Sequence, residues 1–139
     1  MNDRADAVDA RIDRLVQGTA GVILLAAFVF GFPVVLPALA LLLGAGGLAG
    51  PPANVFHWAY GRALAGRLPP DDATVPFETV QAQDLLAAAI LVVASGAYVI
   101  GLGPVAWLLA LVEAGIAIVA ATTGFHLGEY IRSWLRRDR

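Results

Sequence analysis

The sequence contains no cysteine and no lysine, and both absences limit what the protein can do. Without cysteine there is no disulfide bond, no thiolate metal site and no thiol redox chemistry. The 9 basic residues are all arginines, and the 11 acidic residues outnumber them, which leaves a net charge of -2. Such a chain has no basic surface of the kind that nucleic-acid-binding proteins present, so we expect no nucleic-acid partner.

Charged residues are scarce, at 14% of the 139 residues, whereas 59% are apolar. No charged side chain lies between Arg14 and Arg62, and Glu113 is the only one between Asp84 and Glu129. A soluble domain of this length could not bury so much apolar surface. Each stretch is long enough for two membrane helices of about 20 residues joined by a tight turn. The sequence therefore predicts an integral membrane protein in contact with the lipid bilayer.

The expected fold is a single all-α domain over residues 1–139, a four-helix transmembrane bundle made of two helical hairpins. Pro33 and the Gly101–Pro104 segment mark the two tight turns, because proline suits the first turn of a helix. Asp84 is expected at the start of the third span, where a carboxylate favours the helix N-terminus. The expected spans are residues 15–32, 34–49, 84–100 and 104–126.

The segments outside these spans are more polar. Val8, Ile12 and Val16 recur at helical spacing among charged residues, which predicts an amphipathic helix over residues 1–14. Residues 51–83, which include two adjacent prolines followed by two aspartates, form the connection between the hairpins.

The arginines indicate the orientation of the bundle. All of them fall in the N-terminal segment, the central connection or the C-terminal segment, and none falls in the two short turns. With four spans these three segments share one side, and the positive-inside rule makes that side the cytoplasm. We therefore expect a multi-pass protein of the plasma membrane with both termini cytoplasmic.

The two halves of the chain resemble each other. Each hairpin has a turn containing glycine or proline, and Phe56-His57 follows the second span as Phe125-His126 ends the fourth. This correspondence favours an internal repeat whose copies are related by an axis along the membrane normal.

Three stretches carry a family resemblance: the segment from Val8 to Gly18, the segment from Val75 to Gln83, and Gly124-Phe125-His126-Leu127-Gly128-Glu129. In these the chain resembles the small bacterial and archaeal membrane proteins catalogued as domain of unknown function four-three-nine-five. The resemblance implies that the last motif typically reads Gly-Phe-Cys-Leu-Gly-Cys, and that some members accompany rhodanese-like or thioredoxin-like domains. This chain has His126 and Glu129 at the two cysteine positions, so a thiol role implied by the resemblance is not available to it.

His126 and Glu129 are three residues apart, so on a continuous helix they lie on one face. His57 is the only other histidine, and the repeat would bring it to the same membrane depth. Two imidazoles with a carboxylate suit a divalent metal, and two imidazoles alone can hold a haem iron axially. The alternative is that both histidines are interfacial residues bonded to headgroups, water or carbonyl groups.

Glu113 lies near the middle of the fourth span, where a charged carboxylate costs roughly 2.5–3.5 kcal/mol on insertion scales. We expect it to face the bundle interior, at the level that the repeat assigns to Gly44. Its functional interpretation is a contact with a proton, an ion or a ligand. The alternative is a structural glutamate that hydrogen-bonds across helices to Thr19, Ser95 or a carbonyl group.

Several glycines are candidates for close helix packing. Small residues let the backbones of membrane helices approach each other, particularly in pairs four residues apart. Gly44, Gly46, Gly47 and Gly50 form a groove along the second span, and Gly124 and Gly128 form a pair near the end of the fourth.

The leading hypothesis is a non-catalytic accessory or assembly component of a membrane complex, acting with copies of itself or with a partner membrane protein. Little sequence lies outside the bilayer, and the sequence contains no recognisable catalytic motif. A second hypothesis is a membrane redox or metal protein that uses His57, His126 and Glu129. A third is a small oligomeric transporter or channel in which Glu113 lines the path.

Overall fold

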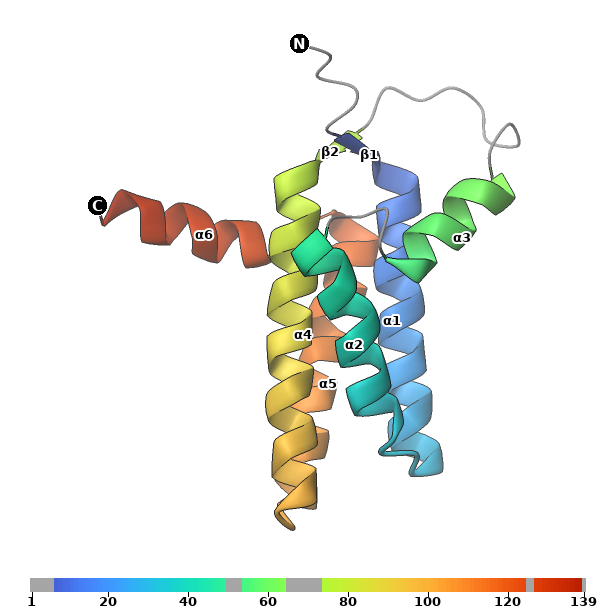
Figure 1. Ribbon diagram of the computed structural model, residues 1–139, viewed down its shortest axis with the longest axis vertical. Helices are drawn as coiled ribbons and strands as arrows, with labels where there is room; N and C mark the ends of the chain where they lie inside the picture. Colours follow the sequence, from blue (N-terminus) through green and yellow to red (C-terminus); the bar gives the residue numbers. More distant parts are fainter. Residues whose placement is uncertain (1–6, 50–53, 65–73, 125–126, 139) are drawn as a thin grey trace.

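The long apolar stretches form helices that stand side by side (Figure 1). The computed structural model describes residues 7–49, 54–64, 74–124 and 127–138. In chain order the elements are β1 (Ala7–Asp9), α1 (Ala10–Phe30), α2 (Val35–Ala49), α3 (Val55–Leu64), β2 (Thr74–Pro76), α4 (Phe77–Val99), α5 (Gly103–Thr123) and α6 (Leu127–Arg137). Helices α1, α4 and α5 are long and apolar enough to cross a membrane, and α2 is a shorter apolar helix. The expected all-α, four-helix architecture is confirmed, whereas the internal repeat stays a prediction.

Helix α1 begins where Asp9 caps it. The Asp9 carboxylate accepts a hydrogen bond of 2.8 Å from the backbone N–H of Arg11, a group that has no partner within the helix. The helix runs unbroken to Phe30, and Gly31 ends it in the left-handed conformation at φ 69, which glycine adopts without a Cβ clash. We expected a separate amphipathic helix over residues 1–14. Among the described residues, Ala7–Asp9 form a strand instead, and residues 10–14 are already part of the first long helix.

Two other helix boundaries differ from the sequence prediction. Helix α4 starts at Phe77, so Asp84 lies about two turns inside the helix and not at its N-terminus. Helix α5 carries a proline in its first turn, as expected, but it ends at Thr123. Gly124 adopts the left-handed conformation at φ 75 and stops the helix before residue 126.

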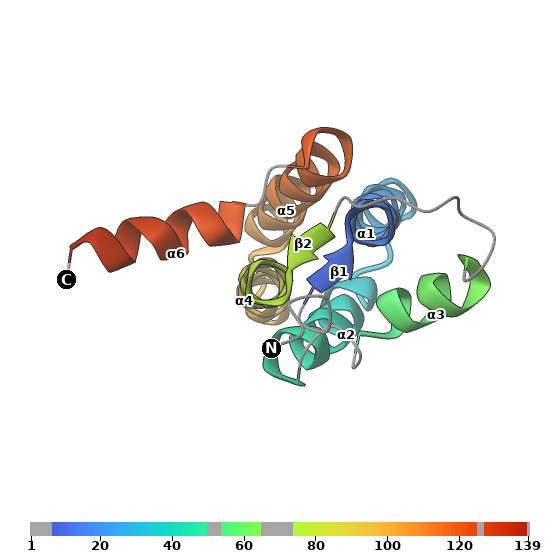
Figure 2. The ribbon, with the colours of Figure 1, turned by 90° about the horizontal axis from the view of Figure 1, so that it is seen from above.

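Neighbouring helices in the bundle are mostly not neighbours in the chain. Helix α1 packs along α5, helix α2 packs along α4, and α4 and α5 join the two pairs. Figure 2 shows the four helices end-on in this arrangement. Helices α1 and α2 have few contacts with each other, so the first hairpin is held together by the second.

The apolar core lies where these four helices meet. Large side chains such as Leu24, Leu36 and Leu91 are fully buried there, and a series of alanines on α4 and α5 fills the remaining space. Because alanine adds only one methyl group, it allows the two helix backbones to approach closely. The core alanines of these helices are Ala87, Ala88, Ala94, Ala97, Ala106, Ala110 and Ala114.

The two ends of the bundle differ in character. At one end, here called the strand end, β1 and β2 pair antiparallel with Val8 opposite Val75, which joins the starts of α1 and α4. Helices α3 and α6 extend sideways from the bundle towards this end (Figures 1 and 2). At the opposite end, here called the turn end, α1 leads into α2 and α4 into α5 through short uncharged turns. The arginines of α3 and α6 therefore lie away from the turn end.

Candidate functional site

Polar side chains are buried inside an otherwise apolar bundle. The buried polar or charged residues in the described part of the chain are Asp13, Gln17, Asn54, His57, Thr79, Gln83, Asp84 and Glu113. All but Glu113 belong to the first turns of α1 and α4 or to the start of α3, which places them in the half of the bundle nearer the strand end. Burying such groups is costly unless they interact with one another. Asn54 bonds to Asp84, His57 faces Asp13, and the charge of Asp84 acts on Glu113; these five residues are called the polar cluster below.

Asp84 lies at the centre of the polar cluster. Its Oδ2 atom accepts a hydrogen bond of 3.0 Å from the side-chain amide of Asn54. The Asn54 Oδ1 atom accepts a second bond of 3.0 Å from the backbone N–H of Phe56 and so caps α3. Gly46 of α2 lies against both side chains, since a Cβ at that position would be 2.6 Å from Asp84 Oδ2 and 2.8 Å from Asn54 Cβ. Glycine at position 46 therefore leaves the space in which Asn54 reaches Asp84.

The short length of α2 explains why polar groups from α3 occupy the part of the bundle nearest the strand end. With 15 residues, α2 is about 22 Å long at 1.5 Å per residue. Helices α1 and α4 extend beyond its end towards the strand end (Figure 1). Asn54 and His57, at the start of α3, are buried in this part of the bundle. The first turn of α3 thus brings an amide and an imidazole against the polar faces of α1 and α4.

His57 faces Asp13 of α1. Its Nε2 atom is 3.7 Å from Asp13 Oδ1, and both side chains are almost completely buried. Neither ring nitrogen of His57 has a hydrogen-bond partner among the described residues. Burial lowers the pKa of His57 below its ordinary value of 6.5, and the nearby Asp13 carboxylate offsets only part of this effect. The structure thus places this histidine inside the protein, not among lipid headgroups.

Glu113 projects into the bundle from the middle of α5 and is only 1% exposed. Asp84 of α4 is close enough for its charge to act on Glu113. The Glu113 Oε2 atom is buried and has no hydrogen-bond partner in the described part of the chain. The hydroxyl groups that we considered as partners bond elsewhere: Ser95 donates to the carbonyl of Leu91, and Thr19 donates to that of Leu15. Two carboxyl groups from neighbouring helices are thus buried within electrostatic range of each other.

The proposed meeting of His57 with His126 cannot be followed in the structure, because His126 lies outside the described residues. The assumption that residues 126 and 129 share a continuous helix with the fourth span is wrong, since α5 ends at Thr123 and Glu129 belongs to α6. Within residues 7–49, 54–64, 74–124 and 127–138, no three His, Asp or Glu side chains are grouped so as to hold a metal ion. The metal or haem hypothesis stays a prediction that depends on His126.

The glycines singled out from the sequence fall in different surroundings. Gly46 and Gly47 lie against α4, where a Cβ on Gly47 would be 2.7 Å from Leu85 Cγ, while a Cβ on Gly44 would meet Ala88 at an ordinary 3.7 Å. Gly124 ends α5 and Gly128 belongs to α6, so they do not form a pair on one helix. Gly50 lies outside the described residues.

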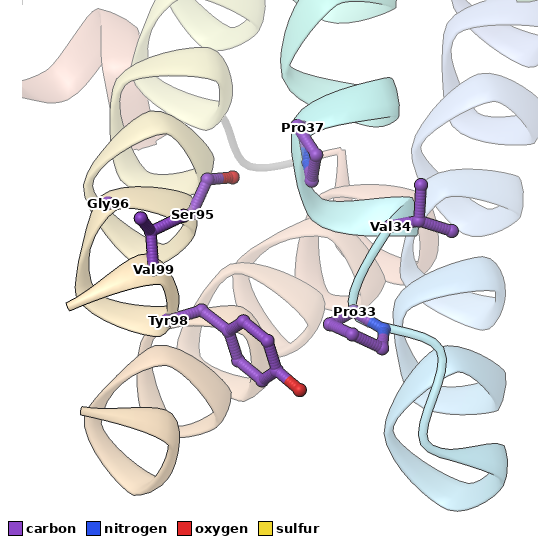
Figure 3. Close-up of a pocket in the computed structure, with 7 residues that line it drawn as sticks. All are labelled: Pro33, Val34, Pro37, Ser95, Gly96, Tyr98 and Val99. Carbon is purple, nitrogen blue, oxygen red and sulfur yellow. The ribbon is translucent and has the colours of Figure 1, made fainter. Parts of the chain in front are cut away.

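A second feature is an apolar recess on the side of the bundle, near the turn end (Figure 3). It has a volume of about 370 Å³ and lies between the start of α2 and the last turns of α4. Gly96 contributes no side chain to it, and a Cβ added there would meet nothing within 4 Å. The residues that line the recess are Pro33, Val34, Pro37, Ser95, Gly96, Tyr98 and Val99.

Sequence reasoning missed most of the polar cluster, although one signal for it exists. The sequence prediction places Asp84 at the start of the third span and Asp13 in the amphipathic segment over residues 1–14. The buried residues of α4 recur at spacings of three and four, and Thr79, Gln83 and Asp84 continue the stripe formed by Ala87, Ala88 and Leu91. This spacing puts the polar residues on the same face as the buried alanines.

Comparisons with known proteins agree with the resemblance seen in the motifs. No curated protein and no solved structure matches the chain. A protein family does match, over residues 8–137, which is nearly the whole length. The chain therefore belongs to the family described as Domain of unknown function (DUF4395).

Proposed function

We propose that the protein is an integral membrane protein that serves as a non-catalytic accessory or assembly component of a membrane complex. The observation that supports insertion into a membrane is the distribution of apolar and ionisable side chains across the bundle. Large apolar residues cover its outside, for example Val29 (73% exposed), Leu41 (76%), Val99 (84%) and Leu108 (63%). The ionisable side chains of Asp13, Asp84 and Glu113 are instead buried at its centre. A lipid environment favours this distribution and water opposes it.

The distribution of arginine supports the proposed orientation. Arg62 is in α3 and Arg136 and Arg137 are in α6, and both helices leave the bundle on the side away from the turn end (Figure 1). Under the positive-inside rule, the strand end faces the cytoplasm of a plasma-membrane protein. The turns at the other end would then lie at the outer surface.

The recess beside Gly96 supports a partner in the plane of the membrane. It opens on the apolar side of the bundle, and small residues at such places allow another helix to approach closely. We propose that a transmembrane helix, from a second copy of this chain or from a partner membrane protein, packs into the recess.

Purification from native membranes under mild extraction tests this role. A matched pair of substitutions gives the control, because neither Gly96 of α4 nor Gly115 of α5 has an atom within 4 Å of an added Cβ, and only Gly96 lines the recess. We expect the native chain and Gly115→Leu to purify with a stoichiometric partner or as an oligomer, and Gly96→Leu to lose it. A native chain that purifies alone as a monomer, or an equal loss in both variants, contradicts the proposal.

The buried carboxyl groups favour a second candidate function, the movement of protons or small cations through the membrane. Glu113 is buried within electrostatic range of Asp84, and its Oε2 atom has no hydrogen-bond partner among the described residues. Ionisable residues inside membrane segments commonly mark such paths. Glu113→Gln keeps the shape of the side chain but cannot bind and release a proton, so proton or cation flux into proteoliposomes should fall in this variant. Native protein without flux, or unchanged flux in Glu113→Gln, excludes Glu113 from such a mechanism.

A further inference from the structure

Helix α6 departs from the direction of the bundle. The sequence led us to expect a fourth span over residues 104–126, but Gly124 ends α5 and a new helix begins at Leu127. Helix α6 contacts α4 and then extends sideways, across the direction of the four bundle helices (Figures 1 and 2). If the bundle spans a membrane as proposed, this direction lies along the membrane surface.

The sequence of α6 is strongly amphipathic. Its large apolar residues recur at helical spacing and therefore share one face of the helix. They are Tyr130, Ile131, Trp134 and Leu135. All four are exposed, by 60%, 38%, 57% and 56% respectively. Four large, exposed apolar side chains on one face of a helix form a surface that water does not favour.

The charges of α6 indicate what covers this face. Arg136 and Arg137 lie in its last turn, and both are exposed. A helix with apolar and aromatic side chains on one face and arginines beside them is typical of segments that lie in the headgroup region of a membrane. Tryptophan and tyrosine favour this boundary because their rings are apolar while their N–H and O–H groups reach water. Arginines near the surface attract anionic lipid headgroups, most of which face the cytoplasm.

We propose that α6 lies flat on the cytoplasmic membrane surface, with Ile131, Trp134 and Leu135 inserted at the boundary between headgroups and acyl chains and Arg136 and Arg137 bound to anionic headgroups. This inference rests on the proposed insertion of the bundle into a membrane. The partner of the apolar face of α6 is then an anionic lipid surface and neither water nor another protein.

Tryptophan fluorescence tests the proposal with the full-length chain in vesicles. The protein has 3 tryptophans, so Trp58→Phe with Trp107→Phe leaves Trp134 as the only one. In vesicles that contain phosphatidylglycerol, we expect blue-shifted Trp134 emission that lipids brominated high on the acyl chain quench. Arg136→Gln with Arg137→Gln should weaken the preference for anionic over zwitterionic lipid by about fivefold for each arginine removed. Arg62→Gln removes an arginine from α3 and leaves α6 intact, so it should leave the quenching of Trp134 unchanged.

The contrary results are equally specific. Red-shifted, unquenched Trp134 emission in both lipids would mean that α6 lies in water. Blue-shifted Trp134 emission without quenching would mean that protein covers α6. Either result overturns the proposal. A chain that keeps only Trp107, which lies in α5 and packs against Phe28 and Tyr98, reports on the bundle itself. Quenching of Trp107 without quenching of Trp134 refutes the role of α6 alone. Loss of quenching at both positions refutes membrane insertion as well.

Discussion

Gly46 on α2 and Asp84 on α4 approach so closely that a methyl group on Gly46 would lie 2.6 Å from the Asp84 carboxylate. The second obstacle, Asn54 Cβ at 2.8 Å, is not the end of a flexible side chain and cannot rotate away. We therefore expect Gly46→Ala to destabilise the bundle by about 1–3 kcal/mol, as overpacking of a tight core does. Denaturation of the protein in micelles by increasing detergent concentration measures the change.

Gly44→Ala is the matched control on the same helix. The added methyl group would meet Ala88 at 3.7 Å, an ordinary contact. We expect this variant to be as stable as the native chain or more stable by up to about 1 kcal/mol, because alanine reduces the freedom of the unfolded chain. Equal effects of the two substitutions would mean that the contact between Gly46 and Asp84 does not limit packing.

The contact between Asn54 and Asp84 leads to a second prediction. Asn54→Asp keeps an oxygen that can cap α3 but removes the amide that donates to Asp84. The Asp84 Oδ2 atom then loses this hydrogen bond and meets another carboxyl group, so we expect a loss of stability of about 1–3 kcal/mol. Asn54→Ser, which can also cap a helix, should be less damaging. If Asn54→Asp is as stable as the native chain, Asn54 acts only as a helix cap.

The lowered pKa of His57 predicts how stability depends on pH. In the unfolded chain His57 takes up a proton near its ordinary pKa of 6.5, whereas in the folded protein burial resists protonation. Above this value the imidazole is neutral in both states, and its contribution is fully present. As pH falls below 6.5, the unfolded state binds the proton first, so the protein loses stability by up to about 1.4 kcal/mol per pH unit until the folded-state pKa is reached.

Melting temperatures of the native chain and of His57→Gln between pH 8 and pH 5 check this prediction. The other titratable groups are common to both proteins, so the difference between the two curves isolates the histidine. The difference in melting temperature between the native chain and His57→Gln should become smaller as pH falls. A constant difference would mean that His57 has the same pKa in the folded and unfolded states.

The general architecture could be predicted because it depends on local composition. Two long stretches with almost no charged residues, each interrupted by a glycine or proline turn, specify apolar helices whatever their neighbours are. Which helices pack against each other could not be predicted in this way. Periodicity shows that α4 has a buried face, but it does not show that α2 and α5 cover that face. The pairing of α1 with α5 depends on contacts between residues distant in sequence.

The polar cluster was hidden for a related reason. Asp13 and Asp84 lie close to other charged residues in the sequence, which favours placing Asp13 in the amphipathic segment and Asp84 at the start of a span. Helix α4 begins at Phe77 instead, so Asp84 lies inside it and is buried. Gly46 was recognised as a packing residue, yet no pattern in the sequence indicates that Asn54 and Asp84 meet beside it. Only Glu113, isolated in an apolar stretch, was conspicuous enough to be predicted as an interior residue.

The central claim is that α1, α2, α4 and α5 cross the membrane so that α3 and α6 lie on one side and the two turns on the other. Because the chain has no cysteine, single substitutions can be labelled without background. Suitable exposed positions are Phe32 and Leu102 at the turn end, Ala63 in α3 and Ser133 in α6.

A membrane-impermeant maleimide added to intact cells is the most direct test. We predict that Phe32→Cys and Leu102→Cys react at once, whereas Ala63→Cys and Ser133→Cys react only after the membrane is opened. Reaction of Ala63→Cys and Leu102→Cys from the same side would contradict the account.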